Sequence, residues 1–196
     1  TIYPNTFTIS EAVAESIMGT DYSSATEAMK NGTPVAKAYA ANVLLDFSKV
    51  TGRLESSNVI GFLEGSDLKD EYLVITAHYD HLGTRANNIS YYGADDAGSG
   101  TVSVHEIAEA FAKAKAAGKG PRRSIIFMMV SGEEKGLWGS DYYVDHPSYQ
   151  LEKTTANLNI DMIGRIDPKR KNGDSSNYVY VVGDDKLSSD LKPISE

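Results

Sequence analysis

Hydrophobic residues along this chain fall into short runs with the length and composition of β-strands. A strand that is buried on both faces has a nearly continuous apolar run, and residues 125–130, Ile-Ile-Phe-Met-Met-Val, are the clearest example. β-Branched and aromatic residues favour a second strand at 72–77. The pattern as a whole predicts six strands: 38–50, 58–63, 72–77, 124–130, 156–160 and 178–182.

Helical periodicity is clearest in residues 101–115. Apolar residues there recur at positions i, i+3, i+4 and i+7, which places them on one helix face: Val104, Ile107, Ala108 and Phe111. The spacing of Thr8 and Glu11 is typical of a capping box at a helix start. We expect further helices at 11–18, 137–144 and from 186 onward, and a short helix or an irregular loop at 21–33.

Strands that alternate with helices predict an α/β fold, in which a mixed, mostly parallel sheet lies between two helical layers. The long segment 78–100 follows a predicted strand and is expected to be an irregular loop. Loops of this length are commonly functional in compact domains. In open α/β sheets, functional residues gather outside the carboxyl ends of the strands. We therefore expect the chemistry of this protein at those strand ends.

Composition and charge narrow the classes of partner. The 196 residues correspond to about one domain, and the formal net charge of -8 argues against nucleic acid or an anionic membrane surface as the main partner. No apolar run approaches the roughly 20 residues of a membrane span, so no membrane insertion is expected. The sequence has no cysteine, which excludes disulfides and thiolate metal ligands. It begins without Met and without a signal peptide, so we expect a processed or excised piece.

Candidate metal ligands directly follow three of the predicted strands. In chain order they are His78 and Asp80, then Glu133 and Glu134, and then Asp161. A glycine-rich segment before the predicted long helix adds a pair of aspartates, Asp95 and Asp96. One imidazole with several carboxylates is a ligand set that suits Zn, Mn or Co.

Each of these features also has a plain structural explanation. A His-x-Asp sequence at a strand end can be a surface pair, adjacent aspartates can form a turn with a helix cap, and adjacent glutamates can lie in a solvated loop. Their convergence on one sheet edge is what favours a metal site. Among other polar and aromatic residues, we expect His81 to pack in the core or at the rim, with a place in the lining of the site as the alternative. We expect Trp138 to lie in the core and Arg165 to form a structural salt bridge.

Five motifs between Asn58 and Arg165 carry a family resemblance. They are HYDHLG at 78–83, GADDAGSG at 93–100, RSIIF at 123–127, SGEEKGLWGS at 131–140 and NIDMIG at 159–164. Together and in this order they resemble the co-catalytic zinc aminopeptidases, a family that includes bacterial leucyl aminopeptidases and, more distantly, glutamate carboxypeptidase II. The resemblance implies a layered zinc-exopeptidase fold.

The resemblance implies a centre with two zinc ions. It implies that His78 and Asp161 bind one zinc, that Glu134 binds the other and that Asp96 bridges both. The family also has a histidine far downstream on the same metal as Glu134, and no histidine follows His146 in this sequence. This centre is therefore expected to lack one ligand.

The resemblance also implies roles for two residues that do not bind the metals. Glu133 would be the general base for a metal-activated water, and Asp80 would fix the ring of His78 through its other nitrogen. Family members often carry a cis peptide bond just after the bridging aspartate, which here is the bond between Asp96 and Ala97.

Residues 1–40 are interpreted as the tail of an inserted protease-associated domain or a linker, and residues 41–196 as a partial catalytic domain that is incomplete at both ends. The expected function is zinc-dependent removal of N-terminal residues from peptide substrates. A single-zinc enzyme related to glutaminyl cyclases and a non-catalytic binding domain remain as alternatives. The chain by itself is expected to be inactive. The natural protein is expected to be periplasmic or secreted, and its oligomeric state is open.

Overall fold

The computed structural model describes residues 6–34, 36–48, 50–85, 88–186 and 188–195. The chain divides into two compact units, Thr1–Arg53 and Leu54–Glu196, and all the candidate ligands belong to the second. None of the helices in the described part combines the length and the apolar content that crossing a bilayer requires. The assignment of residues 1–40 to an inserted domain or linker remains a prediction.

The first unit contains two short helices, α1 (Glu11–Met18) and α2 (Asp21–Lys30). Helix α1 matches its prediction, but the capping residue is Ser10, whose Oγ accepts a hydrogen bond from the Val13 amide at 3.4 Å. The predicted cap at Thr8 was wrong because the helix begins at Glu11, and the capping residue must directly precede the first helical residue.

The strand predicted at 38–50 was wrong. Its described residues, 38–48 and 50, form neither a helix nor a strand, and Lys49 lies outside the described part of the chain. Apolar side chains in this segment are exposed, with Leu44 at 96% and Phe47 at 75%. A run of apolar residues forms a strand only where a neighbouring strand accepts its backbone hydrogen bonds, and the described part of the chain supplies none here.

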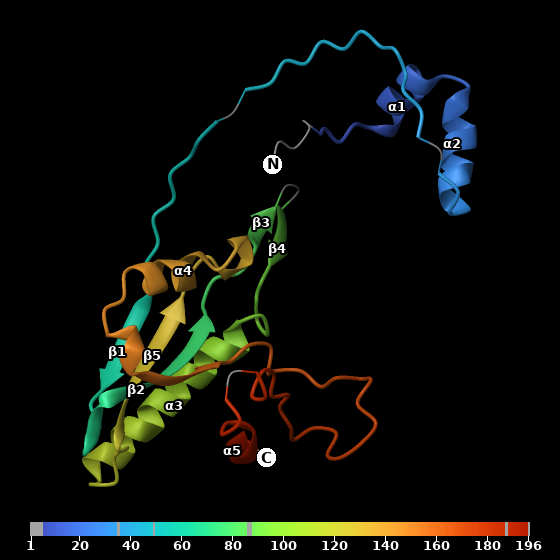
Figure 1. Cartoon of the computed structure of the whole chain (residues 1–196). Helices are drawn as coiled ribbons and strands as arrows, with labels where there is room; N and C mark the ends of the chain where they lie inside the picture. Colours follow the sequence, from blue (N-terminus) through green and yellow to red (C-terminus); the bar gives the residue numbers. More distant parts are fainter. Residues whose placement is uncertain (1–5, 35, 49, 86–87, 187, 196) are drawn as a thin grey trace. The chain divides into compact units, whose positions relative to one another are not determined.

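The second unit is built on a four-stranded sheet (Figure 1), in the order β1 (Val59–Leu63), β5 (Arg123–Val130), β2 (Leu68–His78) and β6 (Thr154–Asn159). Strands β5, β2 and β6 are parallel, and β1 is antiparallel to β5. The predicted strands at 58–63, 72–77, 124–130 and 156–160 are confirmed. The mixed, mostly parallel sheet agrees with the predicted fold class.

Helices cover both faces of this sheet. Alternate residues of a strand point to opposite faces, so β2 directs Ile75 and Ala77 to the face where Val104 of α3 (Gly98–Ala116) packs. Figure 1 shows α3 lying along the sheet. On the other face, Tyr143 of α4 (Trp138–Asp145) packs in a separate buried cluster: Val74, Ile126, Met128 and Val130. This arrangement is the expected layered α/β core.

The segment 78–100 is less irregular than predicted. It contains a small hairpin of β3 (Gly83–Arg85) and β4 (Ile89–Tyr91). A turn at 94–97 then leads into α3. The remaining short elements are the 3-10 helices η2 (Glu133–Lys135) and η3 (Leu151–Lys153), and α5 (Lys192–Ser195).

Three further predictions were wrong. Residues 178–182 form no strand, because no strand of the described sheets pairs with their backbone. Their tyrosines contact Asp167 instead: the Tyr178 hydroxyl accepts a hydrogen bond from the Asp167 amide at 2.6 Å, and the Tyr180 hydroxyl donates one to the Asp167 carboxylate at 3.0 Å. The helix predicted from 186 onward is limited to α5 in the described residues, and Leu187 lies outside them. Trp138, expected in the core, is 56% exposed at the first residue of α4.

Candidate metal centre

His78 is the last residue of the central strand β2. It pairs with Val130 of β5, and its carbonyl oxygen accepts a hydrogen bond from the Thr101 hydroxyl of α3 at 2.8 Å. The side chain is only 2% exposed. Its Nδ1 atom lies 2.9 Å from the carbonyl oxygen of Asp80, so a proton on Nδ1 leaves the lone pair of Nε2 facing the site.

His78 converges with two of the predicted ligands at the carboxyl end of the sheet. Its Nε2 atom lies 3.1 Å from Oδ1 of Asp96, in the turn before α3, and 3.7 Å from Oδ1 of Asp161, two residues after β6. This buried nitrogen has no hydrogen-bond partner among the described residues. A buried polar atom without a partner costs free energy, and a cation held by the imidazole and both carboxylates would remove that cost. We call these three residues the first donor group.

A second donor group contains His81, Asp96 and Glu134. The Nδ1 atom of His81 lies 2.6 Å from Oε1 of Glu134 and 4.0 Å from Oδ1 of Asp96. In each group the candidate ligand atoms lie within 4.8 Å of one another. Asp96 belongs to both groups, which is the position that a bridging carboxylate requires. Core or rim packing was the favoured prediction for His81, and the structure agrees with its alternative, because the ring directs a nitrogen at the predicted ligand Glu134.

The two residues predicted to act beside the metals lie next to the first donor group. Oε2 of Glu133 is 3.9 Å from Nε2 of His78. The Asp80 carboxylate is also 3.9 Å from the His78 ring, at Nδ1, and accepts a long hydrogen bond of 3.4 Å from the Glu133 amide. It is thus the carbonyl oxygen of Asp80, and not the predicted carboxylate, that lies within hydrogen-bond distance of the ring. The catalytic roles of both residues remain predictions.

Asp95 was a candidate ligand in the sequence only as the neighbour of Asp96, and in the structure it belongs to neither donor group and makes structural contacts instead. It is buried, and its Oδ1 accepts hydrogen bonds from the Gly164 amide at 2.8 Å and from the Ser99 hydroxyl at 3.1 Å. The Ser99 oxygen in turn accepts from the Ile163 amide at 3.2 Å. These contacts fasten the segment after Asp161 to the start of α3. The only available signal was its position beside a predicted ligand.

Two smaller expectations agree with the structure. Arg165 forms a salt bridge with Asp95, with Nε 3.6 Å from Oδ2. The peptide bond between Asp96 and Ala97 is cis.

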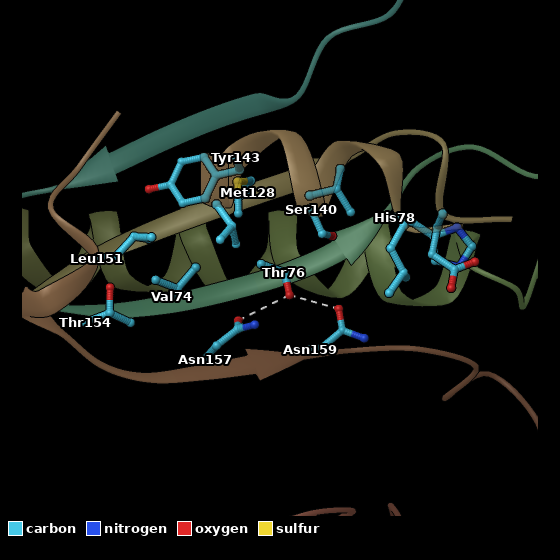
Figure 2. A pocket seen from close by; sticks show the side chains of 14 residues that line it. Val74, Thr76, His78, Met128, Ser140, Tyr143, Leu151, Thr154, Asn157 and Asn159 are labelled. Atoms are coloured by element: carbon cyan, nitrogen blue, oxygen red, sulfur yellow. Dashed lines mark hydrogen bonds and ion pairs between the residues drawn. The ribbon is translucent and has the colours of Figure 1, made fainter. Parts of the chain in front are cut away.

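A pocket of about 490 Å³ opens beside the first donor group (Figure 2). His78 and Glu133 contribute to its lining, together with apolar side chains of β2, β5 and α4. On the side of β6, Asn157 and Asn159 accept hydrogen bonds from the hydroxyl of Thr76, at 3.3 and 2.8 Å. The donor groups are therefore next to a space that could accept part of a bound molecule.

A layered α/β sheet with histidines and carboxylates gathered at its carboxyl end has the architecture of a metal-dependent hydrolase. The chain belongs to peptidase family M28, whose family model matches residues 58–188. The matched segment contains every residue of both donor groups.

Similar proteins include three curated relatives. A probable zinc metalloprotease of Leptosphaeria maculans is 32% identical over 122 residues, which are 60% of this chain and 26% of that protein. The vacuolar membrane protease of Saccharomyces cerevisiae is 38% identical over 57% of this chain and 10% of its own length. Aminopeptidase YwaD of Bacillus subtilis is 35% identical over 56% of this chain and 22% of its own length. The matched segment thus spans about a quarter or less of the length of these relatives.

Proposed function

We propose that the protein containing this chain is a zinc-dependent exopeptidase that removes N-terminal residues from peptides. The observation that carries the proposal is the buried Nε2 atom of His78, which has no hydrogen-bond partner among the described residues and faces Asp96 and Asp161. Membership of a peptidase family supports the reaction class. The names of two relatives, a zinc metalloprotease and an aminopeptidase, support the metal and the N-terminal preference.

In the proposed mechanism, some residues of this chain bind the metal ions and one residue transfers a proton. His78, Asp96 and Asp161 would hold one zinc ion, and Glu134 with Asp96 a second. Bound zinc would lower the pKa of a coordinated water and polarise the scissile carbonyl group. Glu133 would take the proton from the attacking water as its oxygen bonds to the carbonyl carbon. As the carbon–nitrogen bond breaks, the same carboxyl group would deliver that proton to the departing amine.

Two other functions remain in competition. A single-zinc enzyme of the glutaminyl cyclase kind would need one donor group, and the presence of a second group around Asp96 favours two metals. A non-catalytic binding domain would not need a carboxylate at the place of Glu133, which lies 3.9 Å from the His78 ring. Both observations support the peptidase.

Activity should be measured on the longest natural protein that contains this sequence. The substrates are an aminoacyl amide, its N-acetylated counterpart and a peptide that begins with glutamine. An aminopeptidase hydrolyses the first and spares the second, because acetylation removes the free amine. A chelator abolishes the activity, and added zinc restores it.

Other outcomes identify the competing functions. Release of ammonia from the glutamine peptide, without cleavage of the amide, would indicate the cyclase. Absence of any chelator-sensitive reaction would favour a binding domain. Hydrolysis of the acetylated substrate at an equal rate would contradict the N-terminal preference while leaving the peptidase class intact.

A further inference from the structure

Glu133 and Glu134 lie in a short loop that runs from the end of β5 into the first turn of α4. We call this segment, residues 131–139, the Glu133 loop. Its two ends are joined by a backbone hydrogen bond of 2.7 Å from the Gly139 amide to the carbonyl oxygen of Ser131. The place of Glu133 relative to the sheet therefore depends on how these two ends are held.

One side chain from outside the loop joins the same two ends a second time. Asn58 directly precedes β1 and is half-buried. Its Nδ2 atom donates a hydrogen bond of 2.7 Å to the Gly139 carbonyl oxygen, and its Oδ1 atom accepts a longer one of 3.3 Å from the Ser131 amide. A carboxamide carries a donor and an acceptor on one planar group. Asn58 can thus hold both ends of the loop at a fixed spacing.

The packing around Asn58 shows that this contact is close. Gly139 is buried, and a Cβ atom added there would lie 2.4 Å from Oδ1 of Asn58 and 2.5 Å from the Ser131 carbonyl oxygen. Any larger residue at position 139 would push the carboxamide away. The segment before β1 makes a further contact with the same end of the loop, because the hydroxyl oxygens of Ser56 and Ser131 lie 2.6 Å apart.

Hydrogen bonds within the loop connect its ends to Glu133. The Glu133 carbonyl oxygen accepts hydrogen bonds from the amides of Gly136 and Leu137, at 2.9 Å each. The Gly132 carbonyl oxygen accepts one from the Trp138 amide at 3.2 Å. Because the loop is bonded internally in this way, a shift at its ends would move the Glu133 backbone as well.

We propose that Asn58 is a positioning residue, which holds the Glu133 carboxylate in its place 3.9 Å from the His78 ring. Asn58 belongs to neither donor group and acts through the Glu133 loop. The inference rests on the proposed function, because there Glu133 transfers the proton. A general base must lie within hydrogen-bond reach of the proton that it takes, and a displacement of about 1 Å can slow a reaction about 100-fold.

The first test is kinetic and uses the longest natural protein, saturated with zinc. In Asn58→Ala we expect kcat to fall by about 10- to 100-fold, as is typical when a supporting residue is lost, while KM hardly changes. Asn58→Asp keeps the size of the side chain but presents a carboxylate to the Gly139 carbonyl oxygen, so it should be no more active. Ser57→Ala is the matched control, because the contact made by Ser57 uses its backbone carbonyl, which the substitution retains.

A double variant separates positioning from a general loss of stability. Asn58→Ala is combined with Glu133→Gln. If Asn58 acts through Glu133, the double variant should have nearly the same kcat as Glu133→Gln alone, because residues that act as a unit are not additive. A loss of folded protein would instead multiply the two effects. Circular dichroism and melting temperature establish that each variant is folded.

Amide hydrogen exchange supplies a readout that needs no activity. In Asn58→Ala, the amides of residues 131–139 should exchange faster, while those of β2 should not change, because only the loop has lost its support. The Ser57→Ala control should exchange as the wild type does.

Several results would overturn the role of Asn58 and leave the proposed function standing. They are unchanged exchange in the loop, unchanged kcat in Asn58→Ala, and multiplied effects in the double variant. A wild-type protein without chelator-sensitive peptidase activity would overturn the proposed function, and the role of Asn58 with it. That failure is recognised in the wild type alone, before any variant is compared.

Discussion

The central residue of this protein is a histidine whose free nitrogen has no protein hydrogen-bond partner in the described residues. His78 is 2% exposed, and leaving its Nε2 atom without a hydrogen bond costs about 1–3 kcal/mol. Natural proteins keep few such atoms, and those that remain commonly face a ligand or an ion. Nδ1 of His81 and Oε1 of Glu134 are likewise buried and have no hydrogen-bond partner among the described residues. These buried polar atoms lack hydrogen-bond partners within the described part of the chain, and this lack is what indicates a bound cation.

Glu133 offers the sharpest test at the residue scale. Glu133→Gln removes a proton acceptor and keeps the shape of the side chain. Because Glu133 belongs to neither donor group, metal content should stay unchanged while kcat falls by about 10²- to 10⁴-fold. The measurement is kcat and bound zinc on the longest natural protein. Glu106→Gln, on the exposed side of α3, should change neither value. Nearly normal kcat in the Glu133→Gln variant would remove this carboxylate from the mechanism.

At the element scale, helix α3 and the turn before it connect the end of β2, which carries His78, to the segment that carries Asp161. Its start follows Asp96, its Thr101 hydroxyl holds the His78 carbonyl, and Asp95 and Ser99 fasten the segment after Asp161. The ligands therefore depend on how closely this helix approaches the sheet. At Gly100 the helix backbone packs directly on the end of β6, because a Cβ atom there would lie 2.2 Å from the carbonyl oxygen of Ile160.

Gly100→Ala should destabilise the second unit. Alanine favours a helix over glycine by about 1 kcal/mol, but the clash with Ile160 involves backbone and should cost more than that. We expect a lower melting temperature and weaker metal binding, because Ile160 directly precedes Asp161. Calorimetric melting and zinc titration measure these effects.

The matched control for this prediction is Gly61→Ala in β1. Its added Cβ atom would lie 3.9 Å from Phe127, which is an ordinary contact, so little change is expected. If the melting temperature of Gly100→Ala equals or exceeds that of the wild type, the prediction is contradicted. The position of Asp161 then does not depend on the close packing of α3 against Ile160.

At the scale of the whole molecule, four acidic side chains of the site place a high density of negative charge at one edge of the sheet. They are Asp96, Glu133, Glu134 and Asp161, within a chain whose net charge is already -8. Bound cations would relieve this repulsion, so metal binding and stability of the second unit should be linked. A ligand that binds only the folded state stabilises it by about 2.7 kcal/mol at a concentration 100-fold above its Kd.

Chelation should therefore lower the melting temperature of the protein. For a domain of this size, the expected change is on the order of 10 °C between zinc-saturated and zinc-free protein. Differential scanning calorimetry with chelator, followed by added zinc, measures the change, and added magnesium serves as the control because it prefers six oxygen ligands. Equal melting temperatures in all conditions would contradict a metal centre in the folded chain.

The sequence by itself determined which segments form the buried strands and the long helix. It also identified the candidate ligands that directly follow those strands. Strands β2 and β5 and helix α3 were predictable because periodicity is a local property, and His78, Glu133, Glu134 and Asp161 were identified from their places at strand ends. Only the tertiary structure decided which apolar segments find a partner. Residues 38–50 and 178–182 have strand-like composition, but their described residues pair with no strand. It also decided that His81 meets Glu134, because a contact between distant segments depends on the packing of the whole sheet edge and leaves no trace in local pattern.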